Sequence, residues 1–426
     1  MKKAILLIVI AVFVAIPVVF WARTLSSGMP FSSYLFDAGR LLALVGFVFI
    51  LFQYVLSSRI RLIERGIGLD KLFIMHRRLG VVGLILVFTH PILLTVPTIL
   101  QGHIPPFPPM KILGIITLLL IIITAGAAIL YGRIRMKYET WKNIHRAGYL
   151  ILAMAFVHSL FMGSDLYSGT LRKFWMVMAC IYVLVLLYRL GNWIRVRSNP
   201  YNVTEVLQET HDVWSLYFDG RHKDYKPGQF MIVKLVRNGK ASAPHPFTIS
   251  SSPTSDRLAI SVKSSGDFTS TIGDTKADDT AYIDAPYGVF SFLNHGDGDL
   301  VFIAGGIGIT PLMSMLRYIY NSKLERNIIL LWGNKTEKDI VFRDELEKMS
   351  GEMPSLKIVH IMSGQDDWPG EKGYLDEEKL KKLVGDFQGS HFFLCGPPRM
   401  MTSVEKTLRG LGVPKRRIYY ERFALR

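Results

Sequence analysis

The sequence predicts a multidomain membrane protein: a six-helix transmembrane bundle, followed by an antiparallel β-barrel domain and then an α/β domain. Half of the 426 residues are hydrophobic, yet the long apolar runs lie almost entirely before residue 195. After Pro200, apolar and polar residues alternate in short segments bounded by turn residues, as in antiparallel strands. Beyond Leu300, apolar strands lead into glycine turns and helices. The chain is therefore half membrane-embedded and half soluble.

Six apolar stretches are long enough to cross a bilayer, whose hydrocarbon core is about 30 Å thick. We expect spans at residues 1–21, 34–56, 72–96, 110–131, 144–162 and 174–194. The first stretch begins like a signal peptide, but its apolar run is long and no convincing cleavage site follows, so we interpret it as a span. Basic residues cluster in alternate loops, which places the N-terminus and the soluble half in the cytoplasm.

Charge and cysteine content narrow the possible functions. The net charge of +16 could suggest a nucleic-acid partner, but the orientation of the spans already explains the basic loops. We therefore expect membrane lipid as a partner and no nucleic acid. Cys180 lies in an apolar helix and Cys395 in a later strand, and there is no other cysteine. A structural disulfide is not expected, and a cysteine metal site is excluded.

Two histidines bracket each of two apolar stretches. His76 and His90 are fourteen residues apart, which is about 21 Å and nearly four turns of helix, so both rings should leave one face. His145 and His158 repeat the arrangement at a spacing of thirteen. We expect His76 to pair with His145 near the inner side, and His90 with His158 near the outer side. Such pairs suit two b-type haems, and the lack of C-x-x-C-H excludes covalent attachment.

Two points about this membrane half stay open. The four histidines could instead be hydrogen-bonded residues of an ordinary bundle, although four at matched spacing favour ligation. Thirteen residues correspond to about 220° of rotation, so His145 and His158 share a face only if the helix is locally wound differently, which Gly148 could permit. Arg40, just inside the outer end of the second span, could pair with haem propionates, attract an anionic acceptor, or simply reach the interface.

Within the predicted barrel, the segment HPFTISSSP begins at His245. An aromatic residue followed by a hydroxyl can cover a flat ring and bond to its edge, so Phe247 and Thr248 could receive an isoalloxazine. An ordinary β-turn with a core phenylalanine is the alternative. The candidate residues of this segment are His245, Pro246, Phe247, Thr248 and Ser250.

One strand later, the segment KSSGDFTST could hold a pyrophosphate. Gly266 would let the backbone approach closely, while amides and hydroxyls of Thr269 and Ser270 would supply hydrogen bonds. A flexible polar loop is the competing interpretation. Lys263, at the start of the segment, is a further candidate.

The strand Leu300–Ala304 leads into a glycine turn and an apolar helix, the order that seats a dinucleotide pyrophosphate at a helix N-terminus. The turn is not a strict G-x-G-x-x-G; its candidate residues are Gly305, Gly306, Gly308, Thr310 and Pro311. The next strand ends with Lys335 instead of an acidic residue, which favours a 2′-phosphate and hence NADPH over NADH.

A later strand ends in another tight turn formed by Cys395, Gly396 and Pro397. Cys395 is placed where a nicotinamide could lie. A buried structural cysteine is the alternative.

Together these motifs resemble the NADPH oxidases and ferric reductases, in which a six-helix haem domain is joined to a ferredoxin–NADP reductase-like domain. The resemblance rests on the two histidine pairs, His245-Pro-Phe-Thr, Gly305-Gly-Ile-Gly-Ile-Thr-Pro and Cys395-Gly-Pro-Pro. The resemblance implies a transmembrane ferric reductase-like di-haem domain at 1–197, an FAD-binding β-barrel domain at 198–295 and an NADPH-binding α/β domain at 296–426. By the same resemblance, residues 263–269 hold FAD phosphates.

The resemblance also implies roles for single residues and a location. Cys395 would lie beside the hydride path, and Phe423 would be the C-terminal aromatic that stacks on the flavin. We expect a multi-pass protein of the bacterial cell membrane with no obligate protein partner. It would pass electrons from cytosolic NADPH through FAD and two haem b groups to extracytoplasmic dioxygen, giving superoxide. The alternatives are ferric-chelate reduction and an electron-transfer subunit that serves a partner protein.

Overall fold

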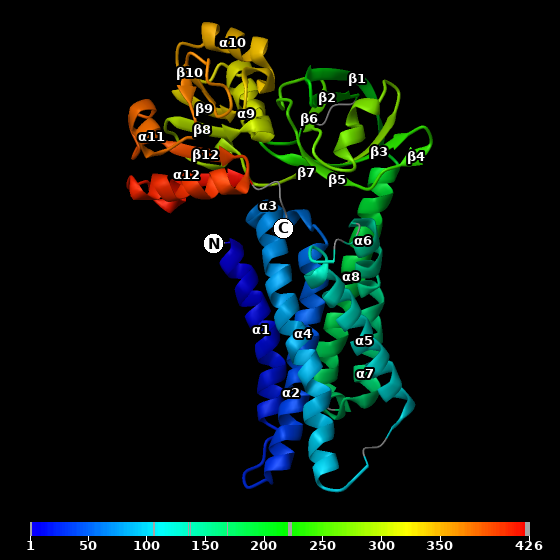
Figure 1. The fold of residues 1–426 in the computed structure, drawn as a ribbon. Coiled ribbons are helices and arrows are strands. Elements are labelled where there is room, and N and C mark those ends of the chain that lie inside the picture. The colour runs from blue at the N-terminus through cyan, green and yellow to red at the C-terminus, as the bar shows by residue number, and fades with distance from the viewer. Residues whose placement is uncertain are drawn as a thin grey trace. The chain divides into compact units, whose positions relative to one another are not determined.

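The computed structural model describes residues 2–104, 107–134, 136, 138–167, 169–219 and 224–421. These residues form two compact units, which divide after Trp193. The first unit is helical, and the second combines strands and helices (Figure 1). The predicted fold class, a multidomain membrane protein, is confirmed.

Within the described residues, six helical segments are long and apolar enough to cross a membrane, and they confirm the predicted spans. These are α1 Lys2–Ala22, α2 Phe31–Ser57, α4 Leu69–Leu100, α5 Pro109–Leu130, the pair α6 Tyr138–Arg146 and α7 Gly148–Met162, and α8 Gly169–Arg197. The short helices α3 Arg61–Ile67 and η1 Ser164–Tyr167 lie in connections between them.

Helix α2 packs closely along α4 because glycines remove side-chain volume at the contact. A Cβ atom on Gly46 would lie 2.7 Å from Cγ2 of Val87, and one on Gly39 would lie 3.1 Å from the His90 carbonyl oxygen. In a membrane, such small residues let helix backbones approach each other and gain dispersion contacts. This packing fixes α4, which carries His76 and His90.

The second unit begins with an antiparallel sheet that curls on itself. Its strands are β1 Pro200–Thr210, β2 Val213–Phe218, β3 Phe230–Arg237, β4 Lys240–Ala241, β5 His245–Thr248, β6 Leu258–Lys263 and β7 Thr280–Tyr287, in the order β4-β3-β7-β1-β2-β6. β5 pairs with β3, and an antiparallel bridge between Ile249 and Ile260 joins its end to β6. Inward-facing apolar residues such as Val203, Leu216 and Met231 fill the centre.

The rest of the second unit is a parallel sheet with helices on both faces. Its strands, in the order β11-β10-β9-β8-β12-β13, are β8 Leu300–Gly305, β9 Ile328–Asn334, β10 Leu356–Met362, β11 Glu371–Lys372, β12 His391–Cys395 and β13 Ile418–Glu421. Alternate residues of β8 enter two cores, which α9 Ile309–Asn321 and α10 Arg343–Glu352 cover on one face, and α11 Glu377–Leu383 and α12 Pro398–Gly410 on the other. β8 and β12 are parallel neighbours, and the order in which successive strands are added to the sheet reverses between them. Ligands of such sheets bind at the carboxyl ends of the strands at this point.

Candidate functional sites

His76 and His145, which we call the inner pair, face each other between α4 and α6. Their ring centroids lie 6.0 Å apart and their planes are inclined at 77°. Nδ1 of His76 donates to the Gln53 carbonyl at 3.2 Å, which leaves Nε2 with a free lone pair. The ring of His145 stacks on Trp141, with centroids 5.5 Å apart. A metal held between the two rings would fit this spacing.

His90 of α4 and His158 of α7, which we call the outer pair, lie near each other. Nδ1 of His158 donates to the Met110 carbonyl at 2.8 Å, again leaving Nε2 free. The bundle makes room for this ring, because a Cβ atom on Gly114 would lie 2.4 Å from it. The structure thus brings the four predicted histidines together in the predicted pairs.

The four imidazoles fit haem ligation on two further observations. Nδ1 of His90 and Nδ1 of His145 are buried and have no hydrogen-bond partner among the described residues. A buried polar atom without a partner costs about 1–3 kcal/mol, so these two nitrogens mark rings that still lack a binding partner. The other two rings donate Nδ1–H to backbone carbonyls, the contact that orients metal-bound histidines.

The spacing difficulty is resolved by a break in the second histidine helix. α6 ends at Arg146 and α7 begins at Gly148, so His145 and His158 do not share one continuous helix. Around the break, Ala147 donates to the Ile144 carbonyl and Leu150 to the Ala147 carbonyl, both with i to i−3 spacing. The winding is therefore locally tighter than in an α-helix.

Arg40 has two carboxylate partners that the sequence did not suggest. Its Nη1 lies 2.6 Å from Oδ1 of Asp37, and its Nε lies 2.9 Å from Oδ2 of Asp165, with Nη2 bonded to the other oxygen. The guanidinium is therefore already neutralised within the protein. Its expected part in binding propionates or an acceptor gains no support from these contacts.

The predicted flavin motif lies on β5. His245 stacks on Phe268 with centroids 4.1 Å apart, and Phe247 lies 6.2 Å from the same ring. Pro246 pairs with Ile232 of β3. Oγ1 of Thr248 is buried and has no hydrogen-bond partner among the residues described, so it suits the polar edge of a bound ring.

Ser250 is placed differently from the rest of this motif. Its hydroxyl accepts a hydrogen bond from Ser261 at 3.0 Å, and its carbonyl accepts one from Arg317 at 2.6 Å. Ser250 thus connects the barrel to α9, and a contact from its hydroxyl to flavin gains no support.

The predicted phosphate loop precedes the short helix η2, Thr269–Asp274. The hydroxyl of Thr269 accepts from the amides of Ser265 and Gly266, both at 3.0 Å, and Ser270 donates to the Asp267 carbonyl. These bonds shape the loop that was expected to hold phosphates. Lys263 forms an ion pair with Asp212 at 3.0 Å, so its positive charge already has a carboxylate partner within the protein.

Two residues, one within this loop and one on a neighbouring strand, were missed by the sequence analysis. Phe268 contacts both aromatic rings of the flavin motif, and the Arg237 guanidinium lies 5.6 Å from the centre of its ring. Arg237 also donates to the carbonyl and hydroxyl of Thr271. A phenylalanine within an otherwise polar loop was the available signal for Phe268.

The predicted dinucleotide turn lies where β8 and β12 end side by side, since Cys395 pairs with Ala304. A Cβ atom on Gly308 would lie 2.2 Å from the Cys395 carbonyl oxygen, and one on Gly305 would lie 2.6 Å from Sδ of Met400 and 2.7 Å from Pro397. Gly396 is equally close, because its Cβ would lie 3.0 Å from Gly305. Only glycine backbone fits at these contacts, so the two predicted turns form one surface.

The first turn of α9 completes this surface. The Thr310 hydroxyl donates to the Ile307 carbonyl at 3.1 Å, Pro311 is buried, and Nε1 of Trp332 donates to the Gly306 carbonyl at 3.0 Å. Gly306 has a φ of +51°, which glycine adopts without strain.

At the end of β9, Lys335 is exposed and follows Asn334. Oδ1 and Nδ2 of Asn334 are both buried and have no hydrogen-bond partner in the described part of the chain. A polar residue that ends an apolar strand was the signal for Asn334, which the sequence analysis missed. Its unsatisfied amide fits a bound nucleotide at this edge of the sheet.

Cys395 is completely buried beneath the turn. Burial raises the pKa of its thiol well above the ordinary value, and the Glu421 carboxylate adds to the effect, so the thiol is neutral. Phe423, the predicted aromatic partner of the flavin, lies outside the described residues.

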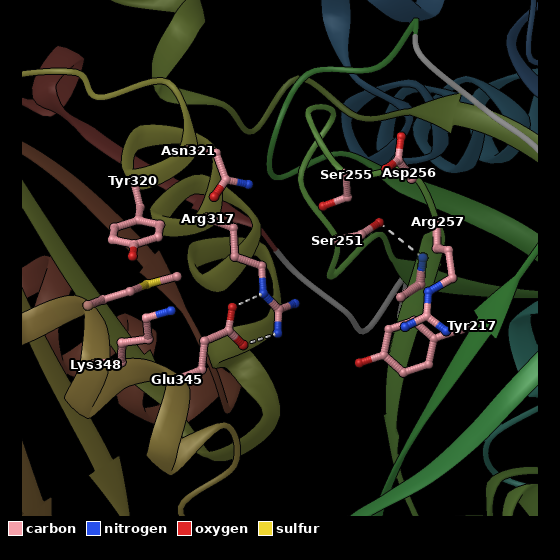
Figure 2. A pocket seen from close by; sticks show the side chains of 12 residues that line it. Tyr217, Ser251, Ser255, Asp256, Arg257, Arg317, Tyr320, Asn321, Glu345 and Lys348 are labelled. Atoms are coloured by element: carbon pink, nitrogen blue, oxygen red, sulfur yellow. Dashed lines mark hydrogen bonds and ion pairs between the residues drawn. The ribbon is translucent and has the colours of Figure 1, made fainter. Parts of the chain in front are cut away.

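A cavity of about 350 Å³ lies between the barrel and α9 and contains none of the predicted site residues (Figure 2). Arg317 and Glu345 form a bidentate ion pair on its wall, at 2.8 and 2.5 Å. Burial opposes the charge of Arg317, but Glu345 outweighs burial and raises the pKa of the guanidinium. The pair joins α9 to α10, and Arg317 further joins α9 to the Ser250 carbonyl.

Three family models match successive parts of the chain. The ferric reductase like transmembrane component matches residues 42–157, the FAD-binding domain matches residues 198–291, and the oxidoreductase NAD-binding domain matches residues 302–406. The chain is a fusion of a ferric reductase like transmembrane component with an FAD-binding and an NAD-binding domain. This fusion is a multi-pass membrane protein with a domain for FAD and a domain for NAD.

Curated relatives match part of the fusion. The glycine betaine monooxygenase reductase subunit of Pseudomonas aeruginosa is 31% identical over 229 residues, which are 51% of this chain and 62% of that protein. NADH-cytochrome b5 reductase 1 of Candida glabrata is 27% identical over 271 residues, which are 56% of this chain and 93% of that protein. The chain thus covers less than two thirds of the length of the first of these relatives.

Among solved structures, the flavohemoglobin of Malassezia yamatoensis with bound FAD and haem matches 92% of this fusion and 98% of that chain. Its TM-score is 0.50 and its sequence identity is 19%, so the likeness concerns the fold alone.

Proposed function

We propose that the chain is a transmembrane NADPH oxidase of the bacterial cell membrane. It takes electrons from NADPH in the cytoplasm and delivers them to dioxygen on the opposite side, giving superoxide, with FAD and two haem b groups bound along the way. The observation that carries this proposal is the pair of facing imidazoles of His76 and His145, with His90 and His158 near each other further along α4.

The chain's own residues hold the groups that this activity needs. His76 and His145 would hold the inner haem, and His90 and His158 the outer one. Phe247 and Thr248 would receive the flavin ring, and the turns at Gly305–Gly308 and Cys395–Pro397 the dinucleotide. When bound, FAD accepts two electrons as a hydride and releases them singly, while each haem iron carries one electron.

If two imidazoles held each haem iron, the acceptor would have no free coordination position there. The protein would then reduce its acceptor without metal ligation, so few residues are needed to choose it. Turnover should therefore depend on access from the outer side more than on specific contacts.

The acceptor is tested with purified full-length protein supplied with FAD, haem and NADPH. We expect steady oxygen consumption and reduction of cytochrome c that superoxide dismutase abolishes. Turnover that occurs only when a ferric chelate is added would contradict superoxide production and favour ferric-chelate reduction, which the matched transmembrane family suggests.

A third possibility is delivery of electrons to a partner protein. The name of one relative, a reductase subunit of glycine betaine monooxygenase, favours this alternative. It predicts little acceptor reduction by the isolated chain and recovery of turnover when a membrane extract containing the partner is added.

Lys335 is proposed to select NADPH through its charge. Lys335→Glu should lower kcat/KM for NADPH by about 10–100-fold, because it removes a charge-assisted contact of about 1.5–3 kcal/mol. The same change should lower kcat/KM for NADH by less than about threefold. Steady-state kinetics with both nucleotides measure the difference.

Lys338→Glu is the matched control, since Lys338 is also exposed and lies three residues further along the chain. It makes the same charge change and should leave both nucleotides nearly unaffected. Equal losses for NADPH and NADH in Lys335→Glu would remove the selective role of Lys335.

A further inference from the structure

The four histidines lie on two helical segments with different spacings, fourteen residues in α4 and thirteen across α6 and α7. His76 and His90 lie in one continuous helix, α4, at a spacing that brings both rings to one side. In a continuous helix, His145 and His158 would differ in direction by about 220°. The break at Ala147 interrupts this helix, so the angle of a continuous helix does not apply to the two rings. Any contact that holds the break therefore also sets the direction of His145.

Two tyrosine hydroxyls hold the start of α7. Tyr54 of α2 donates to the Gly148 carbonyl, and Tyr182 of α8 donates to the Tyr149 carbonyl. Both phenols are buried, and their ring centroids lie 5.3 Å apart. A carbonyl drawn outward by a second donor favours a bend in its helix. The two hydroxyls thus act on the first two residues after the break.

Tyr54 follows Gln53, whose carbonyl accepts the Nδ1–H of His76. Consecutive residues of α2 therefore support both members of the inner pair, Gln53 at His76 itself and Tyr54 at the turn that follows His145. The outer pair is supported by a different helix, because His158 donates to Met110 of α5. The hydrogen bonds of Gln53 and Tyr54 therefore hold the inner pair and not the outer pair.

We propose that Tyr54 is a positioning residue for the inner haem. Its hydroxyl fixes the break between α6 and α7, and thereby the 77° angle between the rings of His76 and His145. This inference rests on the proposed function, because it takes both rings as ligands of one iron. With a haem held by both rings, the angle between the rings would set the anisotropy of its low-spin ferric signal, so ring position would have its own spectroscopic signature.

The test is Tyr54→Phe in the full-length protein, which removes one hydroxyl and keeps the ring. We expect two haems per chain to be retained and one of two low-spin ferric signals to shift in electron paramagnetic resonance. The His90→Ala variant, which keeps the inner pair, identifies which signal belongs to it. Hydrogen exchange at residues 147–152 should accelerate by about three- to tenfold, as for one lost hydrogen bond.

Tyr188→Phe is the matched control. Tyr188 of α8 bonds through its hydroxyl to the backbone of Arg59 and Arg61, away from the break. Its loss should leave the inner signal and the exchange at residues 147–152 unchanged. An unchanged signal in Tyr54→Phe, or an equal shift in both variants, would overturn the inference.

If Tyr54→Phe loses haem, Tyr182→Phe becomes the test of the inference, because it removes a hydrogen bond to the same turn from α8. A shifted inner signal in Tyr182→Phe supports the inference, and a wild-type spectrum overturns it. Wild-type protein with fewer than two haems would instead overturn the proposed function. The exchange measurement needs no haem, so it tells whether Tyr54 still holds the turn in that case.

Discussion

Replacing His90 with alanine is expected to halve the haem content and to abolish electron delivery across the membrane, while NADPH still reduces the flavin. Nδ1 of His90 is buried and has no hydrogen-bond partner among the described residues, so removal of the ring breaks no hydrogen bond of this atom. Loss of one of the two histidines that would hold the outer haem should empty that site. The inner pair and the soluble half do not involve His90 and should remain.

Haem per chain, measured as the pyridine complex, and anaerobic bleaching of the flavin by NADPH check this expectation. His103→Ala is the control, because His103 is exposed in the loop that follows α4. It should keep both haems and full turnover. Two haems per chain in His90→Ala would show that His90 is no ligand, and loss of flavin bleaching as well would indicate general unfolding.

Replacing Gly308 with alanine is expected to disable the nucleotide turn. The added Cβ would lie 2.2 Å from the Cys395 carbonyl oxygen and 2.9 Å from Cα of Gly396. Both neighbours are backbone atoms of a buried strand end, so the strain cannot be relieved by a rotamer change. Overpacking of this kind costs about 1–3 kcal/mol or more. Displacement of the turn by about 1 Å can slow hydride transfer by about 100-fold.

Rapid-mixing measurement of flavin bleaching and the melting temperature of the full chain test the Gly308 expectation. Gly306→Ala is the comparison within the same turn. A Cβ on Gly306 meets no atom within 4 Å, and the positive φ alone costs about 1–2 kcal/mol. Gly306→Ala should therefore bleach the flavin much faster than Gly308→Ala. Equal rates in the two variants would mean that the contact with Cys395 does not govern the turn.

The membrane spans could be predicted because each is a long uninterrupted apolar run, a signal that depends on local sequence only. The strand ends at Gly305 and Cys395 were also visible, since glycine turns follow apolar strands. That these two turns touch depends on β12 pairing with β8, although about ninety residues separate the strands. Sequence periodicity carries no information on such a pairing.

Other parts of the sites could not be predicted because they depend on partners far away in the chain. The carboxylate of Asp165 that bonds Arg40 comes from a loop 125 residues later. The hydroxyls at the break after His145 come from α2 and α8. The spacing of thirteen revealed that something had to change in that helix, but not where the helix would divide. Asn334 was overlooked because its burial without a partner appears only in the folded protein.

The continuity of α4 has a consequence for how this membrane half tolerates change. An added or deleted residue between His76 and His90 would swing one imidazole by about 100° and slide it by about 1.5 Å relative to the other. The segment formed by α6 and α7 should tolerate such a change better, because the turn at Ala147 can absorb a change of register that an unbroken helix would transmit. Helix α4 therefore fixes the distance and angle between His76 and His90, whereas the turn between α6 and α7 lets His145 and His158 adjust to them.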